Sequence, residues 1–134
     1  MLCVSKETRN TLVETLQNKC KPSRMSDHSA GVMIRAFHTS LPVSLMVISL
    51  FAPHYIVILV IALLIIIFFM YIAFGGCILS MLENKMCKDD FTVADPFLEL
   101  LHLDKTSKNR YNITFVIGII YYVMIAAIYH VRFN

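Results

Sequence analysis

Residues 55–79 read YIVILVIALLIIIFFMYIAFGGCIL, and this stretch decides the fold because it contains no charged side chain. A helix needs about 20 apolar residues to cross about 30 Å of hydrocarbon. The stretch exceeds this minimum, so it predicts a membrane-spanning helix that is long enough to tilt. We expect the Gly75-Gly76 pair near its end to permit a bend or close helix packing.

A second apolar segment, VMIRAFHTSLPVSLMVISLF, covers residues 32–51. It only just reaches the length of a span, and Pro42 should kink it because proline removes one amide donor. Arg35 and His38 lie within its first two turns, where such side chains reach the interface at little cost. We predict that both are membrane anchors. The alternative for His38 is that it pairs with a carboxylate or lines a pathway.

A third apolar segment covers residues 113–131. Asn112 and Thr114 are suitable capping residues for the start of a helix there. Tyr111 and Tyr129 lie near the two ends, where aromatic side chains anchor a helix at the membrane–water interfaces. The three segments predict an all-α integral membrane protein with three transmembrane helices.

The composition supports this fold class. Hydrophobic residues make up 57% of the 134-residue chain and charged residues 16%, whereas soluble domains contain about 45–50% apolar residues. The net charge of +3 comes without a basic run, so nucleic acid is not an expected partner. The first thirty residues contain no apolar core of a signal peptide, and we expect the N-terminus to stay on the side where it was made.

The distribution of lysine and arginine supports three spans rather than two. Six of these residues lie in 1–35 and five in 83–111, whereas only Arg132 lies on the opposite side of a three-span arrangement. A two-span arrangement beginning at Tyr55 would remove this asymmetry. Cytoplasmic segments carry an excess of positive charge, so we predict that 1–31 and the loop 83–111 face the cytoplasm or a compartment derived from it.

The polar N-terminal segment, 1–31, precedes a membrane domain that we assign to 32–134. Its first twenty residues place apolar side chains at helical spacing, which predicts a short amphipathic helix capped by Ser5 or Thr8. Leu12 and Leu16 on this helix are predicted partner-docking residues. Residues 21–31 contain proline, glycine and small polar residues and are predicted to be a linker.

The loop 83–111 contains the sequence Asp95-Pro96, which is typical of a helix start with aspartate as the cap and proline in the first turn. So short an apolar helix needs lipid or a partner groove, so we predict that it is interfacial. Its tentative docking residues are Asp95, Pro96, Phe97, Leu100 and Leu101. Acidic residues in this loop could bind a divalent metal or transfer protons, but we interpret them as caps and solvated charges.

The cysteines at positions 3, 20, 77 and 87 form no CxxC pair. A disulfide between Cys77 and Cys87 is possible only where that side of the membrane is oxidising. The local sequence shows no nucleophile–base pair and no phosphate-binding loop. We therefore predict no catalytic residue, no metal, no cofactor and no enzymatic activity. A redox or metal-dependent enzyme at Cys77, Cys87 and the nearby acids is the least favoured hypothesis.

Several motifs occur in a fixed order: FHTSLPVSL, GGCILSMLE, DDFTVADPFLELL and NRYNITF. In this order, over residues 37–115, the chain resembles small uncharacterised membrane proteins of nucleocytoplasmic large DNA viruses, the giant viruses. The segment 76–83 is also similar to the Cys-x-Leu-Thr-x-Leu-Glu signature of a bacterial family of unknown function. The viral resemblance implies a structural protein of the virion's internal membrane that tethers this membrane to minor capsid proteins.

The expected function is thus non-enzymatic anchoring, with the lipid bilayer and minor capsid proteins as partners and with no small-molecule substrate. The alternative is a small accessory subunit of a cellular respiratory or transport membrane complex, because the composition of the chain fits both equally well.

Overall fold

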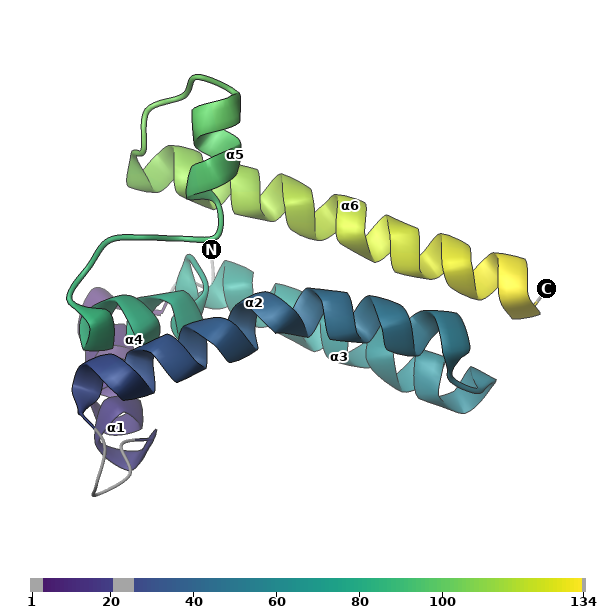
Figure 1. The fold of residues 1–134 in the computed structure, drawn as a ribbon, viewed down its shortest axis with the longest axis horizontal. Coiled ribbons are helices and arrows are strands. Elements are labelled where there is room, and N and C mark those ends of the chain that lie inside the picture. Colours follow the sequence, from purple (N-terminus) through teal and green to yellow (C-terminus); the bar gives the residue numbers. More distant parts are fainter. Residues whose placement is uncertain (1–3, 21–25, 134) are drawn as a thin grey trace. The chain divides into compact units, whose positions relative to one another are not determined.

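The structure is a computed structural model that describes residues 4–20 and 26–133. Within these residues it contains six helices and no strand (Figure 1). The helices are α1 (Lys6–Cys20), α2 (Asp27–Phe51), α3 (His54–Phe74), α4 (Ile78–Cys87), α5 (Asp95–Leu100) and α6 (Ser107–Phe133). The predicted all-α class is confirmed for this part of the chain.

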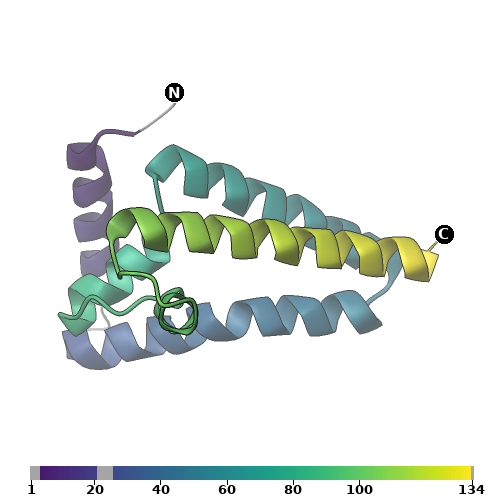
Figure 2. The ribbon, with the colours of Figure 1, turned by 90° about the horizontal axis from the view of Figure 1, so that it is seen from above.

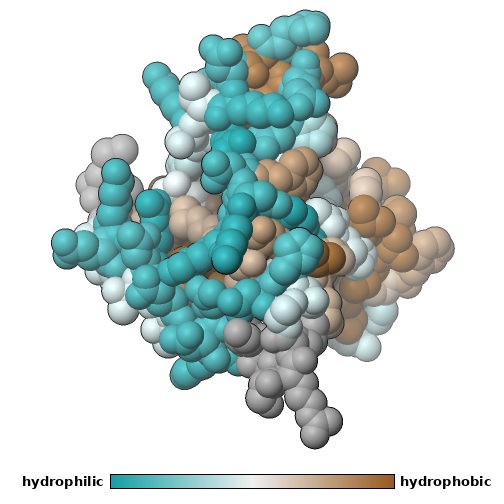
Figure 3. Space-filling view, turned by 60° about the vertical axis from the view of Figure 1, so that its left-hand side comes forward, coloured by the Kyte–Doolittle hydropathy of each residue, from teal (hydrophilic) through white to brown (hydrophobic). Residues whose placement is uncertain are grey.

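Three of these helices, α2, α3 and α6, are long and apolar enough to cross a membrane. Many of their large apolar side chains are exposed, among them Phe51 at 80%, Phe69 at 67% and Val131 at 82%. These side chains form hydrophobic areas of the surface, of which Figure 3 shows a part. Soluble monomers rarely expose apolar surface on this scale. The prediction of three helices of membrane-spanning length and composition is confirmed.

The chain divides into two compact units. The first contains the residues up to Thr39 together with Met70–Thr92, and the second contains Ser40–Phe69 together with the residues from Val93 onward. Each unit has a core of its own.

The core of the first unit joins α1, the first turns of α2, and α4. Its side chains are Val13, Leu16, Ala30, Ile34, Ile78, Met81, Leu82 and Met86. Gly31 makes the close approach of α2 and α4 possible, since a Cβ atom there would lie 2.7 Å from Cys87 Sγ and 2.9 Å from Met86 Cβ. Gly31, which we predicted to lie in a linker, is therefore a helix-packing residue of α2.

The helix predicted over 55–79 ends earlier, at Phe74. Gly75 and Gly76 adopt φ angles of 64° and 152°, which glycine adopts at little cost. Their amides donate to the carbonyls of Ile72 and Tyr71 at 3.3 and 3.0 Å. Arg9 Nη1 also donates to the Phe74 carbonyl at 3.2 Å. The expected bend is thus a full helix end, followed by the separate helix α4.

The core of the second unit lies between α2, α3 and α6. Its side chains are Leu41, Leu45, Met46, Val60, Ile61, Leu64, Tyr121, Ile125 and Ile128. Tyr121 Oη donates to the Pro42 carbonyl at 2.6 Å. At the turn between α2 and α3, Arg132 Nη1 donates to the carbonyls of Ser49 and Ala52 at 2.7 and 3.1 Å. A cation is favourable there, because it satisfies carbonyls at the end of α2.

The starts of two predicted helices need correction. The helix α2 begins at Asp27 rather than at residue 32, and the Ser29 amide donates to Ser26 Oγ at 3.1 Å. The helix α6 begins at Ser107 rather than at residue 113, and the Asn109 amide donates to Thr106 Oγ1 at 3.2 Å. Hydropathy marks only the apolar part of a helix, whereas hydroxyl caps and polar first turns extend it into water. Asn112 and Thr114 therefore lie inside α6.

The predicted N-terminal helix is present, and Ser5, one of the two residues predicted as its cap, occupies the capping position. It begins at Lys6, and the Thr8 amide donates to Ser5 Oγ at 3.2 Å. Figures 1 and 2 show that α1 lies beside α4, against which its apolar residues pack. Residues 21–25 of the predicted linker, and Cys3, lie outside the described residues.

Candidate functional site

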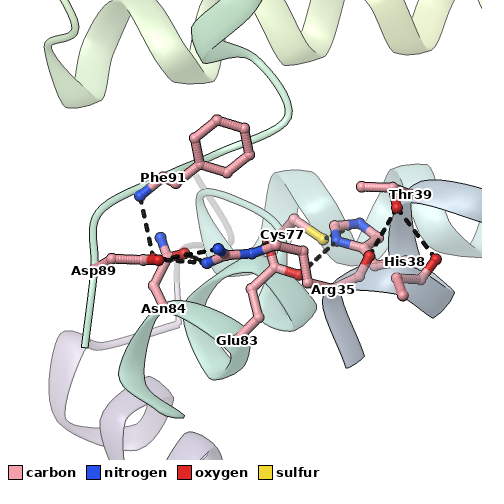
Figure 4. A network of polar contacts seen from close by, with 9 residues as sticks. Arg35, His38, Thr39, Cys77, Glu83, Asn84, Asp89 and Phe91 are labelled. Carbon is pink, nitrogen blue, oxygen red and sulfur yellow. Dashed lines mark hydrogen bonds and ion pairs between the residues drawn. The ribbon is translucent and has the colours of Figure 1, made fainter. Parts of the chain in front are cut away.

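Five polar side chains of the first unit meet between α2 and α4 (Figure 4). They are Arg35, His38, Cys77, Glu83 and Asp89, and we call them the polar cluster. Arg35 and His38 share one face of α2, because residues three apart on a helix are neighbours. Glu83 belongs to α4, Cys77 directly precedes this helix, and Asp89 follows it. The cluster therefore ties the two ends of α4 to α2.

Arg35 and Asp89 form the outer, more exposed part of the cluster. The guanidinium donates to both carboxylate oxygens, at 3.0 Å from Nη1 and 2.6 Å from Nη2. Its Nη2 also donates to Asn84 Oδ1 at 3.3 Å, and its Cζ lies 5.3 Å from the centre of the Phe91 ring. The hydrogen bond from Arg35 holds the pKa of the Asp89 carboxyl below its ordinary value. A bidentate arginine–carboxylate contact of this kind fixes geometry as well as charge.

Glu83 forms the inner part of the cluster, and its side chain is fully buried. Its Oε2 lies 3.3 Å from His38 Nδ1, and its Oε1 lies 4.0 Å from Arg35 Nε. That second oxygen has no hydrogen-bond partner among the described residues. Because a buried carboxylate is costly without a partner, Glu83 requires Arg35 and His38 of α2.

Cys77 lies on the other side of the imidazole, with Sγ 3.3 Å from His38 Nε2. It also occupies the N-cap position of α4, where the positive end of the helix dipole favours a thiolate. Partial burial acts to raise the pKa of the Cys77 thiol. The hydrogen bond and charge of His38, and then the amide and hydroxyl of Ser80, outweigh this and lower that pKa below its ordinary 9.0.

Glu83, His38 and Cys77 thus form a line in which the carboxylate orients the imidazole and the imidazole faces the thiol. This is the geometry of a nucleophile, a base and an orienting group. The interpretation that no nucleophile–base pair exists is therefore wrong, because Cys77 and His38 are arranged as such a pair. Cys77 and His38 are 39 residues apart, so local motifs could not reveal the pair. The available signal was that both residues border apolar segments at ends predicted to share one side of the membrane.

The arrangement does not resemble a metal site. The sulfur of Cys77 and the carboxylate of Glu83 contact opposite nitrogens of the His38 ring, so they cannot reach one ion together. Within the described part of the chain, no group of three or more His, Cys, Asp or Glu side chains is arranged to hold a metal. Cys77 and Cys87 are both free thiols.

The predicted docking residues have different surroundings. Leu16 packs against the core of the first unit, and Leu12 is half-buried. Phe97, Leu100 and Leu101 are exposed, at 44%, 77% and 54%. The exposed side chains are available to lipid or to a partner, whereas Leu16 is already used within the chain.

Asp95 does not cap α5, contrary to our prediction. The N-cap is Ala94, no side chain caps this end, and Pro96 lies within the first turn. The carboxylate of Asp95 is buried and accepts hydrogen bonds from Arg110 Nε and Nη2 at 2.8 and 3.1 Å. An arginine one turn into α6 therefore diverts this carboxylate from the helix cap and ties α5 to α6.

The two predicted aromatic anchors both belong to α6. Tyr111 stacks on Phe115, with ring centres 6.2 Å apart. Tyr129 Oη lies 2.7 Å from His54 Nε2. Their position at the two membrane–water interfaces stays a prediction.

Comparison of the chain with models of known protein families, with curated proteins and with solved structures finds no match. The three apolar helices and the polar cluster are thus the features from which a function can be inferred.

Proposed function

We propose that this chain is a non-enzymatic structural protein that crosses a membrane three times. The observation that carries the proposal is the set of three helices, α2, α3 and α6, that are long and apolar enough to span a bilayer. Each of them exposes large hydrophobic side chains along its length. A bilayer covers such side chains, while the helix satisfies its own backbone hydrogen bonds.

The charge distribution supports one orientation. Of the 12 lysine and arginine residues, only Arg132 lies near the C-terminal end of the third span. The others lie before α2 or in its first half, or in the stretch from α4 to the first turn of α6. By the positive-inside tendency, the N-terminal segment and the loop 83–111 face the cytoplasm or the compartment derived from it.

The two short helices at this side have separate roles in the proposal. The exposed Phe97, Leu100 and Leu101 of α5 suit the interfacial region of the bilayer, where an apolar helix face enters lipid. The helix α1 exposes its threonines and Glu7, and it presents a polar surface to a protein partner.

The resemblance of residues 37–115 to giant-virus membrane proteins supports a specific partner. In the virion, the chain anchors the internal membrane to minor capsid proteins that lie between this membrane and the capsid. Each contact can be weak, because many copies in one membrane act together and raise the overall affinity. The spans supply the anchor and the polar segments supply the contacts.

The orientation can be tested in sealed vesicles that contain the full chain. A protease added from outside should cut both the N-terminal segment and the loop 83–111 in vesicles of one orientation, and neither in vesicles of the other. Detergent should expose all sites in both populations. Cleavage of the two polar segments from opposite faces would contradict the three-span orientation.

The partner can be tested by purifying the tagged chain in mild detergent from infected cells and identifying the bound proteins. Capsid proteins should copurify with the wild-type chain and should be reduced when exposed residues of α1, such as Glu7 and Thr11, are replaced by alanine. A matched change of exposed α5 residues tests lipid contact instead. Recovery of respiratory or transport subunits in place of capsid proteins would assign the chain to a cellular membrane complex.

A further inference from the structure

Cys77 combines a position at a helix boundary with a contact to a histidine. It lies between the end of the apolar helix α3 at Phe74 and the start of α4 at Ile78. It also contacts an imidazole that is held from behind by the buried carboxylate of Glu83. If α3 crosses a membrane, as proposed above, this thiol is at the boundary between hydrocarbon and water.

The contacts of Glu83 determine which nitrogen of His38 faces the thiol as a base. A carboxylate accepts hydrogen bonds, so its contact with Nδ1 keeps the proton on that nitrogen. Nε2 is then free to accept the proton of Cys77. The Glu83 carboxylate is fully buried and contacts His38 through Oε2, so its negative charge stabilises the positive charge that develops on His38 during proton transfer.

The other described thiol provides a contrast within the same helix. Cys87 is the last residue of α4, at the negative end of the helix dipole. Cys77 is the N-cap of the same helix, where the positive end of the dipole favours a thiolate. Both side chains are partly exposed, so exposure alone does not distinguish them.

We propose that Cys77 is an acyl acceptor that takes a fatty acyl group from an acyl thioester, with His38 as its base and Glu83 as the residue that positions His38. This inference rests on the proposed membrane insertion, because the lipid next to Cys77 accommodates the hydrocarbon tail of the acyl group. Cysteines next to membrane spans are a recognised class of acylated residues.

The reaction is a balanced exchange of one thioester for another. The Cys77 sulfur attacks the carbonyl carbon of acyl-coenzyme A and forms a new carbon–sulfur bond, while the bond from this carbon to the coenzyme A sulfur breaks. His38 Nε2 takes the proton of the Cys77 thiol and delivers it to the departing coenzyme A thiolate. No electrons are gained or lost. The acyl group stays on the protein, so the chain is modified and does not turn over.

The product adds an anchor in the position where the chain already meets lipid. Each methylene that is buried in hydrocarbon adds to membrane affinity. A chain that already crosses the membrane does not need this affinity to stay there. The acyl group instead fixes the start of α4 against the bilayer, and with it the polar cluster that joins α4 to α2.

The test uses the full chain in vesicles, in a background with Cys3→Ser and Cys20→Ser, and palmitoyl-coenzyme A as the probe. Intact mass measures the adduct, and hydroxylamine should release it because it is a thioester. We expect one acyl group per chain, the same adduct in Cys87→Ser and none in Cys77→Ser. His38→Gln should slow acylation about 10-fold or more, because general-base assistance contributes at least this much. Glu83→Gln should slow it less.

A second readout separates an activating role of His38 from a structural one. Alkylation of Cys77 by iodoacetamide should reach half its maximal rate at a lower pH in the wild type than in His38→Gln. Circular dichroism of each variant verifies its helix content. Equal acylation of Cys77 and Cys87, or an unchanged rate in His38→Gln, would overturn the proposal. Continuous release of free palmitate that requires Cys77 would also overturn it, because the chain would then be a hydrolase.

Failure of this inference is distinguishable from failure of the proposed function. The vesicle protease assay reports membrane insertion on the same samples. Insertion with the expected orientation but without an adduct on Cys77 rejects only the acylation. Failure to insert rejects the proposed membrane role.

Discussion

His38 Nδ1 lies 3.3 Å from Glu83 Oε2, although 45 residues separate the two in the chain. This contact joins a side chain of α2 to a fully buried carboxylate of α4. It also holds the imidazole so that its other nitrogen faces Cys77. This one contact therefore stabilises the helix packing of the first unit and orients the imidazole that faces its thiol.

Glu83→Gln should destabilise the first unit. The substitution keeps the shape of the side chain but leaves Arg35 and His38 without the buried negative charge that faces them. We expect a loss of about 1–3 kcal/mol in the free energy of unfolding, as for other buried polar groups that lose a partner. Thermal unfolding in detergent, followed by circular dichroism, measures this loss.

The matched control is Glu99→Gln. Glu99 pairs with Lys105, and both side chains are well exposed, at 65% and 47%. Exposed pairs contribute about 0–1 kcal/mol, so this control should unfold close to the wild type. Equal stability of the two variants would show that the Glu83 contacts contribute nothing beyond those of a surface pair.

Gly31→Val should separate α2 from α4. A Cβ atom at position 31 would already lie 2.7 Å from Cys87 Sγ and 3.1 Å from the Cys87 backbone nitrogen, and the backbone cannot move aside at low cost. Overpacking of this kind costs about 1–3 kcal/mol. Faster hydrogen exchange at the amides of α4 is the expected result.

Gly118→Ala is the corresponding control on α6. A Cβ atom there would meet only the Phe68 ring, at 3.9 Å, which is ordinary contact. Alanine in a helix is more stable than glycine by roughly 0.5–1 kcal/mol, so this variant should be neutral or more stable. If Gly31→Val also left hydrogen exchange in α4 unchanged, the close approach of α2 and α4 would be disproved.

Asp95→Asn should loosen α5 from α6. The buried Asp95 carboxylate accepts two hydrogen bonds from Arg110, and asparagine retains only one oxygen and no charge. We expect a cost of about 1–3 kcal/mol, as for hydrogen bonds to charged groups. Limited proteolysis should therefore cut the segment between α5 and α6 faster in this variant. Asp104→Asn is a comparison in an exposed stretch, and equal rates in the two variants would argue against the tie.

The contact between Arg35 and Asp89 should depend on pH in one direction. Because Arg35 lowers the pKa of Asp89 below its ordinary 3.8, the folded state binds this proton less readily than the unfolded state. The stabilisation is thus present above pH 3.8 and is lost as the pH falls through the lower, folded-state pKa. A carbon-detected NMR titration of the Asp89 carboxyl should show a midpoint below 3.8 in the wild type.

Arg35→Gln tests the cause of this shift. Without the guanidinium, the midpoint of Asp89 should rise toward the ordinary value. A midpoint that does not change in Arg35→Gln would assign the lowered pKa to another group.

Hydropathy is a local property of the chain, which is why the sequence by itself determined the helical class and the three apolar helices. An uncharged run such as 56–74 must form a helix in lipid, because each backbone N–H and C=O group needs a hydrogen-bond partner within the segment. The Ser5 cap was equally predictable, since its partner amide belongs to the next turn. The starts of α2 and α6 were harder to predict, because the first turns of these helices are polar and lie outside the apolar runs.

Only the tertiary structure decided which distant residues meet. The pairing of His38 with Glu83 and Cys77, the use of Asp95 by Arg110 rather than as a helix cap, and the packing role of Gly31 all depend on how helices far apart in the chain approach one another. Such contacts have no local signature, because a buried carboxylate and a solvated one have the same sequence letter. Burial makes the difference: it removes water as a partner, so each buried charge must be satisfied by whichever side chain the fold brings near.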